Sequence, residues 1–182
     1  MRAPIDLTRN ERRVLKFLVS DGRVPDADIA RDLSITSQAV GKIRKKLEGD
    51  RIITGYRATV DYEKLGIKVF AVVLFRYIPE VWRQIKSEED IRERVKGPHL
   101  INFYRIPEGD VTHIVTYGFR SLDELDNYFH VLQTERGHIS EIRKLYVFSA
   151  KSLVKEDPRE LVLKVIDEMG QEKMARPMRP NE

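Results

Sequence analysis

Residues 28–47 have the sequence DIARDLSITSQAVGKIRKKL. Apolar side chains recur in this segment at the spacing that two short helices need when they cross over one small core. They are Ala30, Leu33, Ile35, Val40, Ile43 and Leu47. The pattern predicts two helices joined by a tight turn at Ser34, with Thr36 as the N-cap of the second helix. The first third of the chain is therefore expected to form a helix-turn-helix.

The second of these helices has a polar and basic outer face. Because Val40, Ile43 and Leu47 share one side of the helix, most of the other side chains point outward. A recognition helix places a face of this kind in the major groove of DNA. The residues expected to contact DNA, on this helix and after it, are Thr36, Ser37, Gln38, Gly41, Lys42, Arg44, Lys45, Lys46, Arg51, Tyr56 and Arg57.

Different side chains in this set suit different parts of DNA. Gln38 and Lys42 are predicted to contact base edges, since Gln can bond adenine at two points and Lys can bond guanine. Arg44, Lys46 and Arg51 are better placed for phosphates, which position a protein without specifying sequence. The helix is therefore expected to both hold and discriminate DNA.

Charge is distributed unevenly along the chain. The 182 residues carry a net charge of +4. Residues 1–60 hold 13 Lys or Arg against 8 Asp or Glu, whereas the remainder holds 20 against 21. This asymmetry is expected when one module meets nucleic acid and the other has a different role. The alternative for the basic run is an ordinary solvated helix face, and Gly41 within it either permits close approach to the groove or is merely tolerated.

Composition and motifs exclude several kinds of chemistry. The chain has no cysteine, which excludes disulfides, thiolate nucleophiles and cysteine-ligated metals. Its four histidines are scattered, and the common phosphate-loop, nucleophile, zinc and calcium motifs do not occur. We therefore predict no catalytic residue, no metal and no cofactor. Without a signal peptide or a long apolar tract, the protein is expected to be cytoplasmic and to have no membrane partner.

After a hinge at residues 62–67, the pattern changes to strands alternating with helices. Strands are predicted at 69–77, 99–106, 111–119 and 139–148, and helices at 80–96 and 121–133. The order βαββαβ is that of a ferredoxin-like domain. The expected fold class is α+β: a winged helix-turn-helix domain at 1–61, with a hairpin wing from residue 51, and a ferredoxin-like oligomerisation domain at 68–150.

The predicted strand 69–77 is apolar on both faces. One face can pack on the two helices of its domain, which leaves the second face to be covered. Either a second copy of the chain covers it, sheet to sheet, or the chain's own C-terminal helix does. That helix is predicted at 158–169, within the segment 151–170, and the tail 171–182 is expected to be disordered.

Three short blocks carry a resemblance to a known family. They are Leu47-Glu48, Ile52-Ile53-Thr54-Gly55-Tyr56 and Leu65-Gly66. With the two-domain architecture, they resemble the Lrp/AsnC family of feast/famine transcription regulators, from about Leu7 to Ala150. The resemblance implies a regulator that binds double-stranded DNA, forms homodimers through its C-terminal domain and often octamers, and in many members binds an amino acid between dimers.

The resemblance also points to an effector loop. The family's loop has a Gly followed three residues later by Asp; here Gly109 matches, Thr112 replaces the acidic residue, and one extra residue precedes the Gly. Asp110 could pair with an α-ammonium group from a shifted position, so Gly109, Asp110 and Thr112 are the candidate effector residues. Alternatively, the segment is a hairpin turn in which Gly109 supplies a positive φ.

Two other functions are compatible with the same two-domain build. Siroheme-decarboxylating proteins share it, but they are identified by a Trp-Pro-Tyr-Asn-like stretch with a neighbouring His. This chain has His99 and Tyr104 near the corresponding strand, and no such stretch follows Gly109. A ligand-sensing or protein-sensing module that binds DNA weakly is the other alternative. Because function is argued from the site, we expect a sequence-specific transcription regulator and not an enzyme.

Overall fold

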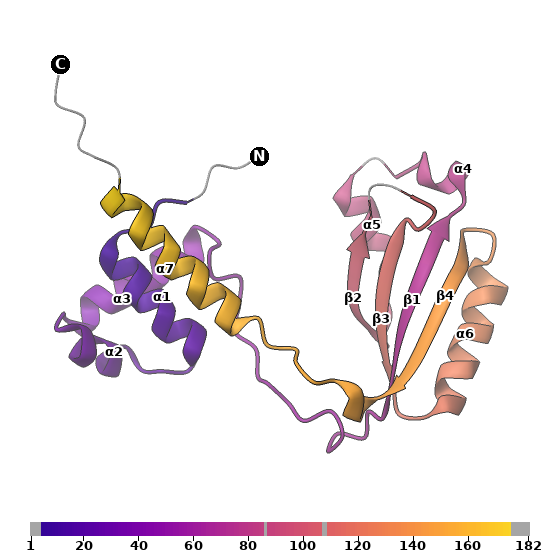
Figure 1. Ribbon diagram of the computed structural model, residues 1–182, viewed down its shortest axis with the longest axis horizontal. Coiled ribbons are helices and arrows are strands. Elements are labelled where there is room, and N and C mark those ends of the chain that lie inside the picture. Colours follow the sequence, from indigo (N-terminus) through magenta and orange to yellow (C-terminus); the bar gives the residue numbers. More distant parts are fainter. Residues whose placement is uncertain (1–4, 86, 107–108, 176–182) are drawn as a thin grey trace. The chain divides into compact units, whose positions relative to one another are not determined.

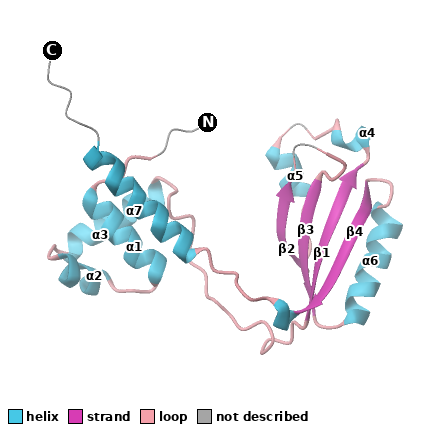
Figure 2. Cartoon of the chain, in the orientation of Figure 1, coloured by secondary structure: helices cyan, strands magenta, loops and turns pink. Residues whose placement is uncertain are grey.

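The computed structural model describes residues 5–85, 87–106 and 109–175. They form two compact units (Figure 1). The first contains the chain up to Thr59 together with the chain from Glu156 onward, and the second is Val60–Lys155. Figure 2 shows the second unit as a sheet with helices, whereas the regular structure described in the first is helical. The predicted α+β class, a helix-turn-helix beside a ferredoxin-like fold, is confirmed.

The first unit begins with three helices, α1 (Arg9–Ser20), α2 (Asp26–Leu33) and α3 (Ser37–Gly49). Thr8 starts α1 through a capping box with Glu11, so the helix begins at Arg9. The turn between α2 and α3 has Ser34 in the left-handed region, at φ 55°. Their core consists of Val14, Leu18, Ile29, Ala30, Leu33 and Val40. The predicted spacing therefore places the right residues inside.

The C-terminal helix α7 (Arg159–Ala175) belongs to this same unit. It lies along α1, and Ile166 is buried with Leu7, Leu15 and Leu47 (Figure 1). The alternative that this helix covers the second sheet face is therefore wrong. The helix also begins later than the predicted segment 151–170 and continues past it, so residues 171–175 of the expected tail are helical; 176–182 lie outside the described residues.

The expected hairpin wing is not formed. Residues 51–61 contain no strand. The backbone N–H groups of Ile52 and Ile53 both donate to the carbonyl of Leu47, at 2.9 and 3.0 Å, and the two side chains pack against the helical core. Because these isoleucines complete the end of α3, they are not available as the first arm of a hairpin, and the chain continues as coil.

The second unit is built on one antiparallel sheet. Its strands are β1 (Val69–Tyr77), β2 (Leu100–Arg105), β3 (His113–Phe119) and β4 (Ser140–Ser149), in the order β2-β3-β1-β4. β1 and β4 therefore pair directly although most of the unit separates them in sequence. This order is that of the predicted ferredoxin-like fold.

The helices of this unit follow the prediction only in part. α6 (Leu122–Arg136) lies where a helix is predicted at 121–133, and it begins after Ser121, whose side chain accepts from the backbone of Glu124. The single helix expected at 80–96 is instead two short helices, α4 (Pro79–Trp82) and α5 (Glu88–Arg94). Ser87 forms a capping box with Asp90 and starts the second of them, which is why one continuous helix does not form. A short 3₁₀ turn, Ala150–Ser152, follows β4.

The two faces of the sheet differ in what covers them. Ala71, Val73 and Phe75 of β1 pack with Leu125 and Phe129 of α6 and form the core of the unit. On the other face, which we call the open face, Phe70 is buried between Tyr62 and Phe148. The remaining open-face side chains of β1 are only half-buried; they are Val72, Leu74 and Arg76. The sheet thus keeps a partly exposed apolar surface.

Candidate nucleic-acid interface

The start of α3 presents a free polar surface. Thr36 caps the helix, and its hydroxyl accepts from the backbone N–H of Ala39 at 3.1 Å. The side chains of Ser37, Gln38, Lys42 and Lys45 are exposed. Within the described residues, none of these four has an ion pair or a side-chain hydrogen bond. Gln38, Lys42 and Lys45 follow one another at i, i+4 and i+7, so they lie along one side of the helix.

Arg44 has a different role from the one expected of it. Its guanidinium donates to Asp26 Oδ1 through Nε at 2.8 Å and Nη2 at 2.6 Å, and Nη2 also donates to the carbonyl of Val24 at 2.9 Å. Burial disfavours its charge, but hydrogen bonds with Tyr56 and Asp26 outweigh this and raise the pKa of Arg44. Arg44 therefore ties α3 to the start of α2 and is not a free phosphate ligand.

Tyr56 is held by the same group of residues. Its hydroxyl accepts from Arg44 Nη1 at 3.3 Å and donates to Glu48 Oε1 at 2.9 Å. Its ring lies below the guanidinium, with 5.9 Å between Cζ and the ring centroid. A Cβ on Gly22 would come within 2.9 Å of this ring, so glycine is required there for the ring to pack. We call Asp26, Arg44, Glu48 and Tyr56 the Arg44 cluster.

Lys46 is likewise engaged within the protein. Its Nζ donates to Glu11 Oε1 at 2.6 Å, and the second carboxylate oxygen of Glu11 accepts from the backbone N–H of Thr8 at 2.8 Å. The hydrogen bond from Lys46 is the main cause that lowers the pKa of Glu11, a residue only 5% exposed. Lys46 thus neutralises a buried carboxylate of α1 and is not the unpaired phosphate ligand that the sequence predicts.

Gly41 faces the protein and not the outer side of α3. It is half-buried, and a Cβ there would lie 3.2 Å from Asp26 Oδ2. The glycine therefore permits close packing of α3 on the start of α2. The expectation that it brings the helix backbone close to DNA is not supported by this geometry.

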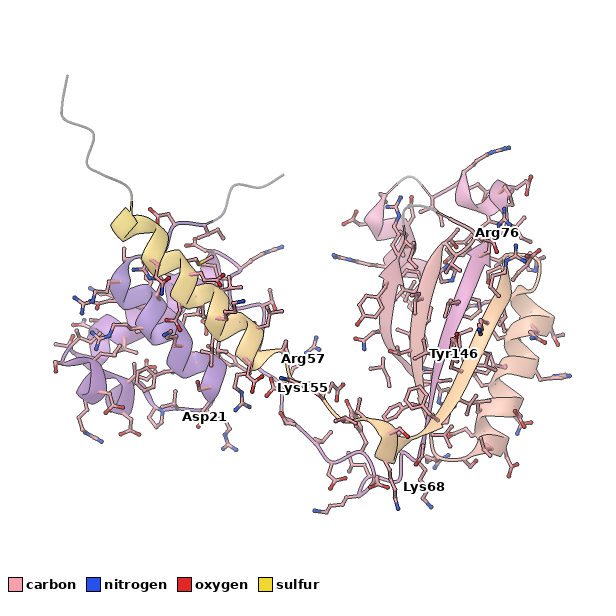
Figure 3. The ribbon with its side chains drawn as sticks, viewed as in Figure 1. Asp21, Arg57, Lys68, Arg76, Tyr146 and Lys155 are labelled. Carbon is pink, nitrogen blue, oxygen red and sulfur yellow. The ribbon has the colours of Figure 1, made fainter. Side chains whose placement is uncertain are left out.

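Two arginines after α3 remain free. Arg51 lies just past the helix at φ 56°, and Arg57 lies on the coil that leaves the first unit (Figure 3). Both are exposed, and neither has an ion pair with a described residue. Together with Lys42 and Lys45, they are the cations of the predicted set that the structure leaves available.

The candidate effector residues are engaged in local structure. Asp110 Oδ1 accepts from Arg76 at 2.6 Å and from Arg143 at 2.9 Å. Thr112 accepts from the backbone N–H of Tyr77 at 2.8 Å, and Gly109 has φ 103°. These contacts favour the hairpin-turn interpretation. The Asp110 carboxylate already has two cationic partners, and the positive φ of Gly109 is the backbone conformation that such a turn requires of a glycine.

The sequence did not reveal the partners Asp26 and Glu11. Each is an acidic residue in the first turn of a helix, where the helix dipole is a sufficient explanation. They lie 18 and 35 residues from Arg44 and Lys46, so no local spacing connects them. Among the described residues there is no cluster of three or more potential metal ligands, and no described helix is long and apolar enough to span a membrane.

A helix-turn-helix with a free polar recognition face, beside a ferredoxin-like unit, defines a DNA-binding transcription regulator. No family model matches the chain. It is 32% identical over 101 residues to the HTH-type transcriptional regulator LrpA of Pyrococcus horikoshii, which covers 52% of this chain and 72% of that protein. The chain belongs to the Lrp/AsnC family of transcriptional regulators.

Solved structures agree with this assignment at the level of fold. An AsnC family transcriptional regulator from Agrobacterium tumefaciens superposes with a TM-score of 0.65 at 23% identity, over 83% of this chain and 94% of that one. A transcriptional regulator from Neisseria meningitidis, solved as a complex with L-Met, gives 0.62 at 17% identity, over 83% and 94%. The enzyme alternative is not favoured, because these relatives are named as regulators.

Proposed function

We propose that this chain is a sequence-specific regulator that reads DNA with the first three turns of α3. The observation that carries the proposal is the row of Gln38, Lys42 and Lys45 on one side of the helix, whose side chains are exposed and have no ion pair with a described residue. Gln38 and Lys42 contact base edges, and Lys45 contacts phosphate, together with Arg51 and Arg57. Arg44, Lys46 and Tyr56 act indirectly, by holding α3 in place.

The chain acts as a homodimer formed through the open face of the sheet. Val72 and Leu74 are half-buried there, and the neighbouring Tyr104 and Tyr146 are 55% and 46% exposed. Figure 3 labels Tyr146 on β4 and Arg76 on β1. Since α7 packs in the first unit, a second sheet is the partner that suits this surface. Two recognition helices then read the half-sites of an inverted repeat.

The proposal includes a response of the regulator to a small molecule. It also includes further assembly of the dimers to octamers. The support is the L-Met complex of the Neisseria meningitidis regulator. In this chain the Asp110 carboxylate is paired with Arg76 and Arg143, so an amino acid that uses the loop must displace one of them. A change in DNA affinity with added L-amino acids is the test.

Selection of duplexes from a random pool tests the DNA function. We expect a palindromic consensus sequence. Titrations followed by fluorescence anisotropy should then show higher affinity for this sequence than for scrambled DNA. Gln38→Ala and Lys42→Ala should each reduce that discrimination by about 1–3 kcal/mol. Lys164→Ala, an exposed lysine of α7 in the same unit, is the control and should bind as the unaltered protein does. Equal binding to all duplexes would contradict the proposal.

A further inference from the structure

The second unit contains a cavity of about 240 Å³ between the helix-covered face of the sheet and α6. It is separate from the Gly109 loop and from the open face. The described residues that line it are Phe75, Tyr77, Val95, Lys96, Leu100, Phe103, His113, Val115, Tyr117, Tyr128, Leu132, Arg136, Ile139 and Ser140. An apolar cavity of about 150 Å³ is enough to bind benzene. The space here therefore suits a ring that carries substituents.

Flat side chains surround the inner part of this cavity. The His113 ring is stacked near Phe75 and Phe103, with 5.0 Å between ring centroids in each case, and lies 4.4 Å from Tyr77. Tyr117 and Tyr128 add two more rings, with 5.5 Å between their centroids. Offset and edge contacts with such rings favour a planar aromatic ligand over an aliphatic one of equal volume.

His113 contributes a polar atom to this aromatic lining. Its Nδ1 lies 2.9 Å from Thr112 Oγ1, which also accepts from the Tyr77 N–H and lies 3.2 Å from the Phe75 carbonyl. All three contacts are satisfied when Oγ1 donates to the carbonyl and Nδ1–H donates to Oγ1, which leaves Nε2 as an acceptor.

This Nε2 atom is the polar atom that His113 can offer to the cavity. Within the described part of the chain, no fully buried side-chain nitrogen lacks a partner, and His113 has no other hydrogen bond. Because Nε2 is unpaired, it must be accessible, and the cavity is the space that His113 lines. Burial lowers the pKa of His113 to about 4, so the ring is neutral and accepts at neutral pH. A ligand hydroxyl is the group that fits it.

The cavity has cationic groups where it meets solvent. Lys96 and Arg136 are its exposed lining residues, whereas the others are buried or half-buried. Arg136 lies in the last turn of α6, and Lys96 follows α5. Among the described lining residues none is Asp or Glu. An anionic group on the ligand is therefore favoured at this end, and a carboxylate matches the fork of an arginine.

We propose that this cavity binds a small aromatic carboxylate with a ring hydroxyl, its ring among Phe75, Phe103 and Tyr128. The hydroxyl donates to His113 Nε2, and the carboxylate lies at Lys96 and Arg136. Binding itself does not depend on DNA recognition. The further role of the ligand as an effector rests on the proposed regulatory function.

Calorimetric titration of the full chain without DNA tests the binding site. The probes are 4-hydroxybenzoate and 4-hydroxyphenylacetate, which differ in reach. Saturable heat is expected for at least one of them. Benzoate lacks the hydroxyl and 4-hydroxybenzyl alcohol lacks the charge, so each should bind about tenfold more weakly than its parent. Cyclohexanecarboxylate should bind more weakly still, because it is not planar.

Two pairs of variants separate the site from general charge effects. Lys96→Gln with Arg136→Gln should lower affinity for the better probe by at least about tenfold. Lys68→Gln with Lys151→Gln removes two exposed charges of the same unit that do not line the cavity, and should leave affinity unchanged. Leu132→Trp, which fills the cavity from α6, should abolish binding, with folding checked by circular dichroism.

Two results would overturn the proposal: no saturable heat with any aromatic acid at millimolar concentration, or equal affinity in the Lys96→Gln, Arg136→Gln variant. Either result is independent of DNA binding, which is measured separately by anisotropy. If the probe binds but leaves operator affinity unchanged, the site stands and its effector role is rejected.

Discussion

At the scale of single residues, the basic charges of α3 divide into two groups with different roles. Lys42 and Lys45 are exposed and unpaired among the described residues, whereas Arg44 and Lys46 neutralise Asp26 and Glu11. The ion pairs of Arg44 and Lys46 take two charges from the recognition surface but fix the helix on its neighbours. Counting charges on the helix therefore overestimates its contacts with DNA.

Arg44 should be sensitive even to a change that keeps its charge. Lysine has no planar guanidinium group. Arg44→Lys therefore cannot form the two bonds to Asp26, and it cannot bond both the Val24 carbonyl and Tyr56. We expect the free energy of unfolding of the first unit to fall by about 1–3 kcal/mol, measured by urea denaturation. Lys42→Arg is the matched control and should leave stability within about 0.5 kcal/mol. Similar stability of both variants would contradict the structural role.

His113 should make stability depend on pH. Burial lowers its pKa from 6.5 to about 4, so between these values the unfolded chain binds a proton that the folded site does not. The contribution of neutral His113 to the free energy of unfolding is fully present above about pH 6.5. It is lost as pH falls toward 4, by up to about 3 kcal/mol. The free energy of unfolding, measured by urea denaturation, should differ less between pH 7 and pH 4.5 in His113→Phe than in the unaltered protein. The exposed control, His130→Asn, should keep the original difference.

At the scale of elements, α7 is a structural part of the helix-turn-helix unit. The chain leaves this unit after α3, forms the whole sheet, and returns to place Ile166 beside Leu7, Leu15 and Leu47. Lys16 and Asp167 add an ion pair between α1 and α7. The first unit therefore cannot be cut from the sequence as residues 1–61 without exposing part of its core.

Shortening Ile166 tests this dependence. Ile166 is 4% exposed, and Ile166→Ala should destabilise the first unit by about 2–4 kcal/mol through lost burial and the cavity left behind. Val165 precedes it on the same helix and is 41% exposed, so Val165→Ala should change stability by less than about 1 kcal/mol. Thermal unfolding followed by circular dichroism distinguishes them. Equal melting temperatures would show that α7 does not stabilise the unit.

At the scale of the whole molecule, the proposed dimer can be tested through the oligomeric state in solution and through the salt dependence of DNA affinity. Val72→Lys puts a charge in the open face and should convert the dimer to a monomer in light scattering after gel filtration. Leu145→Lys is the control, since Leu145 lies on the opposite side of the sheet and is already 39% exposed. If both variants stay dimeric, the open face is not the interface.

The available cations predict how the dimer responds to salt. Of these, Lys45, Arg51 and Arg57 are the proposed phosphate ligands, three per protomer and hence about six phosphate contacts per dimer. Operator affinity should then fall by about 10³–10⁵ between 50 and 200 mM salt. Anisotropy titrations at several salt concentrations measure the slope, and Lys45→Ala should reduce it by about two for the dimer. A flat response would exclude this mode of binding.

The sequence by itself determined those helices and strands whose apolar spacing and capping residues lie close together in the chain. The apolar spacing of residues 30–47 predicts the helix-turn-helix core, Thr36 and Ser121 begin their helices, and the alternating strands predict the ferredoxin-like order. These features depend on side chains a few residues apart, so periodicity and capping are sufficient to identify them.

Only the tertiary structure decided which side chains face each other across long separations. The pairs Arg44–Asp26 and Lys46–Glu11, the return of α7 to α1, and the cavity around His113 each join residues that share no local pattern. A charge has the same appearance in a sequence whether it faces solvent or a buried carboxylate. Its role depends on packing, because burial determines which cations are neutralised within the protein and which remain for DNA.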